Sequence, residues 1–153
     1  RGEAEVNAGG HPQRPFVLVA QPSRFDPSRV PTGDGQVLWS YCHVPNGSTV
    51  DMTARIEAQI ERFAPGFSDT IVARHAAGPA WFEAHNENNV GGDIGGGSPR
   101  GAGLVLRPGW RLHPYRTSDP RLFLCSASTP PGAGVHGMCG WHAAQAVLRT
   151  TLR

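Results

Sequence analysis

The sequence predicts an α+β fold: a mixed, largely antiparallel sheet with flanking helices, ending in a strand–Gly-rich turn–helix element. Two observations carry this prediction. Short apolar runs of strand length alternate with Pro- and Gly-rich connections, and residues 49–67 repeat apolar side chains at three- and four-residue steps. A chain of 153 residues is long enough for one hydrophobic core. We therefore expect a flexible, polar lead-in over residues 1–14 and one domain over residues 15–153.

Two strands are predicted in the first quarter of the chain. Residues 16–21 are apolar on both faces, which is typical of a central strand. Residues 37–44 form the second strand, with one face that carries Val37, Trp39, Tyr41 and His43. Because the intervening residues contain turn signals and no helix, we expect the two strands to pair antiparallel.

A helix should follow the second strand. Ser48 or Thr49 is its predicted cap, and Pro65-Gly66 its predicted end. Asp51 and Arg55 have the spacing of an ion pair on one helix face. One apolar stripe, which we expect to face the sheet, consists of Met52, Ile56, Ile60, Phe63 and Phe67.

The middle of the chain alternates short predicted elements with loops. Residues 70–74 and 104–106 are predicted strands, and a short helix over 80–86 follows Pro79. A strand on each side of a helix gives a crossover connection, and therefore a mixed sheet. The Gly-rich residues 91–97 lack the ending of a phosphate-binding P-loop, so the pattern alone indicates a flexible loop, whereas the family resemblance given below implies the lining of a cavity.

The last predicted element starts with an apolar strand over residues 122–127. A Pro- and Gly-rich turn follows, and then a helix from Val135 to the chain end. Gly137 and Gly140 lie inside that predicted helix, where each costs about 1 kcal/mol relative to alanine. Either a cofactor approaches the start of the helix, or the helix packs closely on the strand; the pattern leaves both interpretations open.

Residues 122–140 resemble the C-terminal flavin-binding signature of phytoene desaturase-like (phytoene dehydrogenase-like) FAD-dependent oxidoreductases, in the flavin amine oxidase-like superfamily. Residues 39–45, 56–67 and 89–94 also resemble the C-terminal third of that family. The chain departs from the family at the strand end: many relatives have Gly-Ala-Gly or Gly-Asp there, and this chain has Ser126-Ala127-Ser128.

The resemblance implies FAD as cofactor and dehydrogenation of a hydrophobic substrate, with hydride transfer to flavin N5. It places residues 126–128 near the ribityl chain and residues 135–138, as the first turn of the last helix, at the pyrimidine edge of the flavin. It identifies no catalytic residue in this chain. The residues expected to contact the cofactor are Ser126, Ala127, Ser128, Gly134, Val135, His136, Gly137 and Met138.

FAD enzymes of this class hold the ADP moiety on a strand–Gly-rich turn–helix unit, and this sequence has no such pattern. We expect a C-terminal, substrate-binding part of a longer oxidoreductase, whose partners are the N-terminal FAD-binding half and a hydrophobic substrate. Alone, it should be inactive and should retain no FAD. The alternative is a non-enzymatic module that forms a homodimer, or binds an apolar ligand, through its sheet.

Several other classes of protein are disfavoured. The net charge of +2 comes from scattered arginines, which argues against nucleic-acid binding, and no apolar run is long enough for a membrane span. Three cysteines on apolar elements indicate reduced thiols in a cytoplasmic protein. His136, Cys139 and His142 would be spread over roughly 9 Å of one helix, too far for a single metal ion. No Gly-x-Ser-x-Gly motif supports hydrolysis.

Overall fold

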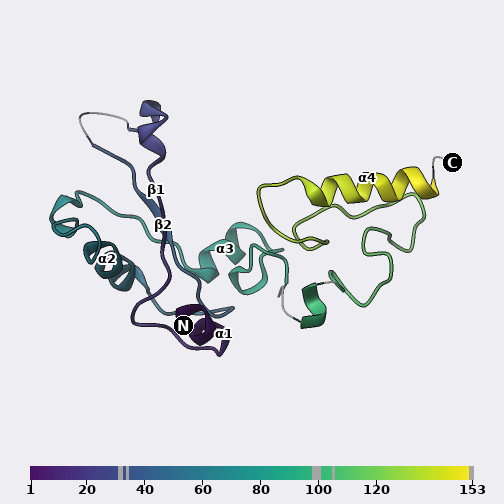
Figure 1. Ribbon diagram of the computed structural model, residues 1–153, viewed down its shortest axis with the longest axis horizontal. Helices are drawn as coiled ribbons and strands as arrows, with labels where there is room; N and C mark the ends of the chain where they lie inside the picture. Colours follow the sequence, from purple (N-terminus) through teal and green to yellow (C-terminus); the bar gives the residue numbers. More distant parts are fainter. Residues whose placement is uncertain (31–32, 34, 98–100, 105, 152–153) are drawn as a thin grey trace. The chain divides into compact units, whose positions relative to one another are not determined.

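The computed structural model describes residues 1–30, 33, 35–97, 101–104 and 106–151 (Figure 1). The chain divides into two compact units, Arg1–Gly78 and Pro79–Arg153. In the described residues there are four α-helices and one two-stranded antiparallel sheet, which confirms the α+β class. None of the described helices has the length and apolar character needed to cross a lipid bilayer.

The sheet of the first unit consists of β1 (Leu18–Ala20) and β2 (Trp39–Tyr41). They pair antiparallel, as predicted, with Leu18 opposite Tyr41, although both strands are shorter than the sequence pattern indicated. The ring of Tyr41 lies 5.2 Å from that of Trp39 and 5.6 Å from that of His43. These ring contacts confirm that the three aromatic side chains share one face.

Helix α2 (Thr53–Glu61) begins later and ends earlier than predicted. Its first turn is closed by Asp51, whose carboxylate accepts a hydrogen bond from the Thr53 N–H at 2.8 Å, so the predicted caps Ser48 and Thr49 are wrong. The predicted ion pair of Asp51 with Arg55 does not form. Instead, Arg55 donates from Nη1 to the carbonyl oxygen of His11 at 2.6 Å.

The apolar stripe along α2 is buried only at its start. Met52 is 5% exposed, whereas Phe63 is 78% exposed. Phe63 lies beyond the last residue of the helix, where the helical period no longer fixes its direction. The expectation that the whole stripe faces the sheet is therefore wrong.

The predicted lead-in contains a further helix, α1 (Gly2–Asn7), with Val6 buried. Glu3 contacts His43 at 2.7 Å, and the His11 ring contacts Ser48 at 2.7 Å. Together with the Arg55 contact described above, these bonds attach residues 1–14 to segments that follow β2 in the sequence. The domain boundary at residue 15 stays a prediction.

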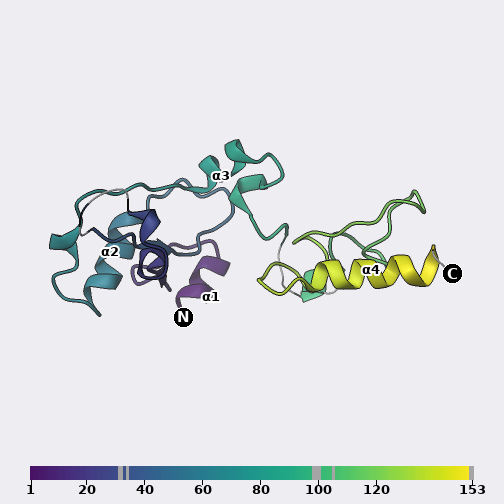
Figure 2. The ribbon, with the colours of Figure 1, turned by 90° about the horizontal axis from the view of Figure 1, so that it is seen from above.

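The second unit contains α3 (Pro79–His85), which confirms the predicted short helix, and α4 (Met138–Thr150). Figure 2 shows α4 with preceding loop segments of its unit lying along it. Ala143 on α4 is buried, and the His142 ring stacks on Tyr115 at 6.0 Å. These contacts place the terminal helix against a loop of the same unit.

Two predicted strands are absent from the described residues. Of residues 70–74, Thr70 ends a 3-10 helix (Ser68–Thr70) and the rest do not pair, and residues 122–127 form one isolated bridge, between Phe123 and Arg116. Val72 is 98% exposed and Leu122 59%, because neither run has a neighbouring strand to cover it. Of the third predicted strand, Leu104 ends a 3-10 helix (Gly101–Leu104), and Val105 lies outside the described residues.

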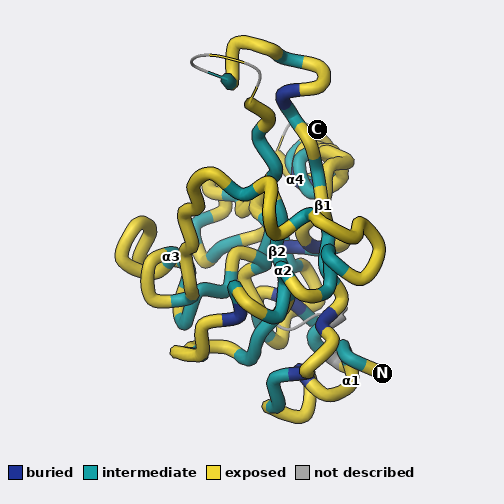
Figure 3. The backbone as a smooth tube through the Cα atoms, turned by 90° about the vertical axis from the view of Figure 1, so that its left-hand side faces the viewer, coloured by how far each residue is buried: buried dark blue, intermediate teal, exposed yellow. Residues whose placement is uncertain are grey.

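Burial is sparse along the described chain (Figure 3). Its buried apolar side chains are Val6, Pro12, Pro15 and Met52 in the first unit and Ala143 in the second. Three polar side chains are buried as well: Ser23, Arg107 and Thr129. In the second unit, polar contacts therefore organise the loops where a sheet was predicted.

Candidate cofactor site

The site predicted from the sequence centres on a tight turn over residues 126–132. Thr129 is fully buried, and both its N–H and its hydroxyl donate to the carbonyl oxygen of Ser126, at 3.0 and 2.8 Å. The Gly132 N–H then donates to the carbonyl of Thr129 at 2.9 Å. These consecutive bonds fix the backbone of the turn without a strand on either side.

Arg107 joins this turn to the Gly-rich loop. Its Nη2 donates to the carbonyl oxygens of Ala127 at 2.9 Å and Gly95 at 2.6 Å, and the residue is only 6% exposed. Planar guanidinium donors can hold two acceptors at a fixed separation. Two segments about 30 residues apart in the sequence are thereby held side by side.

Glycine is required on both sides of this junction. A Cβ atom on Gly96 would lie 2.8 Å from the Cβ of Ser128, and one on Gly132 would lie 2.8 Å from Nη1 of Arg107. Both glycines also have positive φ, 65° and 108°, which L-residues rarely adopt. The close approach of the loop to the turn thus explains two of the glycines in the sequence.

The charge of Arg107 is not balanced locally. No carboxylate in the described part of the chain lies within ion-pair distance of its guanidinium, and its buried Nε has no hydrogen-bond partner there. The nearby acid, Asp93, uses its two carboxylate oxygens on the N–H groups of Gly95 and Gly97, at 2.8 and 2.7 Å. Asp93 therefore shapes the Gly-rich loop.

Helix α4 begins later than predicted. Gly137 is its N-cap and has a left-handed φ of 63°, so Val135, His136 and Gly137 precede the helix and are not its first turn. A Cβ on Gly137 would meet nothing within 4 Å. The positive φ, and not a steric neighbour in the chain, explains why glycine stands there, since side chains with a Cβ rarely adopt this conformation.

The start of α4 offers hydrogen-bond donors. The Met138 N–H donates to Nδ1 of His136 at 3.0 Å, while the N–H groups of Cys139 and Gly140 precede the first possible helical bond. Val135 is fully exposed, Met138 38% and Trp141 54%. An open apolar surface therefore borders the helix start, which carries a partial positive charge.

The other predicted site residues have local partners. The hydroxyls of Ser126 and Ser128 lie 2.6 Å apart, so they bond to each other and not to a histidine base. Gly134 lies against the His136 ring, because a Cβ there would be 2.7 Å from its Cδ2 atom. His136 precedes α4, so it does not share a helix with Cys139 and His142. No group of three or more potential metal ligands occurs among the described residues.

Three residues that organise this region had no role in the sequence-based prediction. They are Arg107, Tyr115 and Cys139. Tyr115 donates from its hydroxyl to the Pro130 carbonyl at 2.9 Å, and burial, followed by the nearby Cys139, raises its pKa. Cys139 donates from Sγ to the carbonyls of Thr129 and Gly132, at 3.5 and 3.3 Å. Each side chain contacts the turn from a different part of the chain, which no local pattern reveals.

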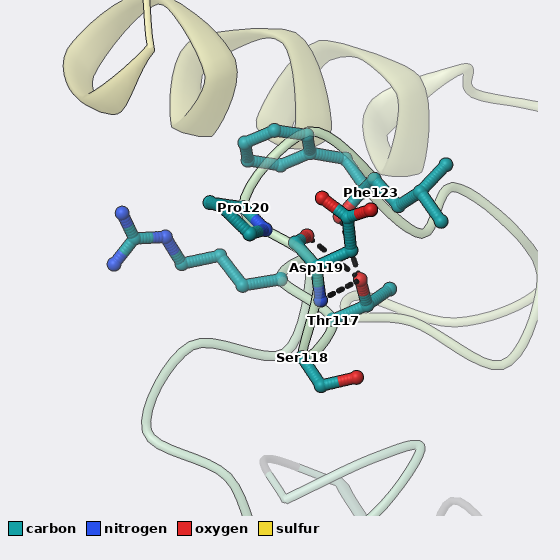
Figure 4. Close-up of a pocket in the computed structure, with 7 residues that line it drawn as sticks. Thr117, Ser118, Asp119, Pro120 and Phe123 are labelled. Carbon is teal, nitrogen blue, oxygen red and sulfur yellow. Dashed lines mark hydrogen bonds between the residues drawn. The ribbon is translucent and has the colours of Figure 1, made fainter.

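A separate hollow of about 250 Å³ lies in the neighbouring loop (Figure 4). Asp119 is on its wall, and its pKa is lowered by hydrogen bonds from Arg121. Thr117 donates from Oγ1 to the Asp119 carbonyl at 2.9 Å, which closes the loop on itself. The hollow contains none of the predicted cofactor residues. It is lined by Arg116, Thr117, Ser118, Asp119, Pro120, Leu122 and Phe123.

The chain is therefore an α+β protein in which a buried arginine, Arg107, joins a Gly-rich loop to the turn that precedes helix α4. In sequence it is similar to pyridine nucleotide-disulfide oxidoreductase domain-containing protein 2. Identity to the protein of Rattus norvegicus is 31% over 157 residues, covering 92% of this chain and 26% of the relative. Identity to the protein of Mus musculus is 29% over 152 residues, with the same coverage.

The chain therefore spans about a quarter of the length of the curated relatives it matches. No protein-family model matches it, and no solved structure does.

Proposed function

We propose that the chain is the flavin-contacting C-terminal part of an FAD-dependent, phytoene desaturase-like oxidoreductase that acts on a hydrophobic substrate. The ADP moiety of FAD would be held by a nucleotide-binding region outside these 153 residues. The observation that carries the proposal is the junction at Arg107, which brings the Gly-rich loop and the predicted flavin turn together. Similarity to relatives named for an oxidoreductase domain supports the same class.

The residues present fit an anionic, planar cofactor. Three features are complementary to negative charge: a buried guanidinium whose Nε has no partner among the described residues, two Gly-rich segments in close approach, and the N–H groups of Cys139 and Gly140, which precede the first helical bond. When bound, FAD supplies the chemistry, by accepting a hydride equivalent from a substrate carbon. The chain's own residues would bind and orient it.

Each predicted contact has a distinct task in this proposal. The turn at Ser126, Ala127 and Ser128 presents backbone to the ribityl chain, since the two hydroxyls are already bonded to each other. The segment from Gly134 to Met138 lies beside the pyrimidine end, where the partial positive charge of the α4 start favours negative charge. The exposed Val135, Met138 and Trp141 offer apolar contact to a ring or to a hydrophobic substrate.

The decisive experiment compares the full-length gene product with a segment of residues 1–153. We expect the full-length product to be yellow, with one FAD per chain by absorbance and by mass spectrometry of the released cofactor. The segment alone should be colourless and without oxidoreductase activity. Stoichiometric FAD on the segment alone would overturn the proposal that the ADP moiety is bound outside residues 1–153. A full-length product without flavin would overturn the proposed function itself.

A second candidate is a non-enzymatic module that pairs with a second copy through its sheet. The observation in its favour is that Val19 on β1 and Trp39 on β2 are 45% and 54% exposed. Light scattering tests it: a dimer that becomes a monomer on Trp39→Ser, in a flavin-free protein, would favour this candidate. The cytoplasmic location stays a prediction, which cell fractionation can check.

A further inference from the structure

Arg107 is a charged residue that is almost completely buried. It is 6% exposed, and no carboxylate in the described residues neutralises it. Carbonyl oxygens of Gly95 and Ala127 accept from Nη2, but the buried Nε has no partner in the part of the chain that the structure describes. Removing a charged group from water without a counter-charge is unfavourable, so the burial of Arg107 calls for a physical explanation.

The position of Arg107 indicates what that explanation is. Its guanidinium lies between the Gly-rich loop at Gly95 and the turn at Ala127, which the proposed function assigns to the flavin, and it contacts the backbone of both. Gly132 leaves room for Nη1, because a Cβ atom there would lie 2.8 Å from it. A purely packing role would be filled by an apolar side chain at no electrostatic cost.

We propose that Arg107 is the positioning residue of the flavin site. It holds the Gly95–Gly96 backbone against the turn at Ala127, and its uncompensated positive charge favours the negative charge that a flavin gains on reduction. This inference rests on the proposed function. It goes further by assigning the charge of the site to one residue that lies outside the predicted flavin signature at 122–140.

Two variants separate the bridge from the charge. Arg107→Lys keeps the charge but has no planar fork to bridge two carbonyls, and Arg107→Gln keeps an amide donor but removes the charge. The matched control is Arg121→Gln, since Arg121 belongs to the same unit, has an 85% exposed side chain and pairs with Asp119 on the surface. All would be made in the full-length gene product, with the FAD dissociation constant and the flavin midpoint potential measured for each.

We expect both Arg107 variants to weaken FAD binding roughly 10- to 100-fold, as loss of a charged hydrogen bond does. The midpoint potential should fall in Arg107→Gln and stay near the wild-type value in Arg107→Lys. Arg121→Gln should change neither quantity. An unchanged potential in Arg107→Gln would reduce Arg107 to a structural clamp and overturn the inference.

If Arg107→Gln does not fold, Arg107→Lys alone decides: wild-type FAD affinity in that variant would overturn the bridging role, and a weakened affinity with wild-type potential would support it. Failure of the proposed function looks different, because the wild-type full-length product would then bind no FAD at all. That result would remove both proposals together, whereas a yellow wild type with unaffected variants removes only the role of Arg107.

Discussion

The two units of this chain differ in the residues that are buried inside each of them. In residues 1–78 a strand pair and α2 form where the apolar pattern predicts them, and Val6 and Met52 are among the buried residues of this unit. In residues 79–153 the centre is polar: a buried arginine and a buried threonine, bonded to backbone carbonyls of glycine-rich loops. Apolar periodicity therefore informs on the first unit far better than on the second.

The largest effect should come from Gly132→Ala. Its φ of 108° is unfavourable for alanine, and the new Cβ would lie 2.8 Å from Arg107 Nη1. Strain and the clash together should destabilise the second unit by about 2–4 kcal/mol. Gly97→Ala is the matched control, because Gly97 has a similar φ of 117° but nothing within 4 Å.

Thermal unfolding of both glycine variants in the full-length product measures the difference. Gly97→Ala should cost only the backbone strain, about 1–2 kcal/mol. Equal losses in the two variants would show that the junction at Arg107 contributes no packing of its own. The contrast between a polar second unit and an apolar first unit would then be weaker than described.

In the first unit, we expect a smaller but clear loss from Met52→Ala. Met52 is 5% exposed, and burial of a side chain of this size is worth about 2–3 kcal/mol. Phe63→Ala, at a position 78% exposed, should cost less than about 0.5 kcal/mol. Chemical denaturation distinguishes them, and a Phe63 variant as unstable as the Met52 variant would restore the stripe predicted from the sequence.

The smallest expected effect is a dependence of loop stability on pH, which should differ between the two units. In the first unit, N–H groups of Ser68 and Gly66 bond to Glu61 and hold the pKa of its carboxyl below the usual 4.5. This stabilisation is present above pH 4.5 and is lost as the pH falls through the lowered pKa of the folded state. In the second unit, in contrast, the N–H groups of Thr129 and Gly132 donate to backbone carbonyls, which do not titrate.

We therefore expect the amide chemical shifts of Gly66 and Ser68 to titrate in acid, and those of Thr129 and Gly132, which donate to backbone carbonyls, to stay constant. In Glu61→Gln the shifts of Gly66 and Ser68 should lose their pH dependence. Titration of both pairs of amides together would indicate a common unfolding event. It would contradict the view that the loop at Glu61 and the turn at Thr129 are closed independently of each other.

The sequence allowed prediction of elements whose partners are local or clearly patterned. The antiparallel pairing of β1 and β2 and the helix after Pro79 were of this kind. Residues 122–127 were predicted as a strand from their apolar run, but a strand needs a neighbour, and only the Arg116–Phe123 bridge is present in the described residues. Gly137 was predicted inside the helix because a glycine with a left-handed φ cannot be distinguished, from the sequence alone, from a glycine within a helix.

The candidate site was located by resemblance and refined by contacts that cross the sequence. Residues 126–128 and 134–138 were predicted to contact the cofactor, and that role stays a prediction. The contribution of Arg107 could not be anticipated, because its acceptors at Gly95 and Ala127 are backbone carbonyls. Every residue has a carbonyl, so side-chain identity says nothing about which ones a buried guanidinium will bind.

The buried turn at Thr129 has a consequence for deuterium labelling. The Thr129 N–H is bonded to Ser126 and belongs to a fully buried residue, and the N–H of the buried Gly132 is bonded to Thr129. Amides of this kind exchange with solvent only when their surroundings open. Although this segment has no helix or strand, its amides at Thr129 and Gly132 should exchange as slowly as those of α4. They would appear in an exchange map as slowly exchanging amides within a loop.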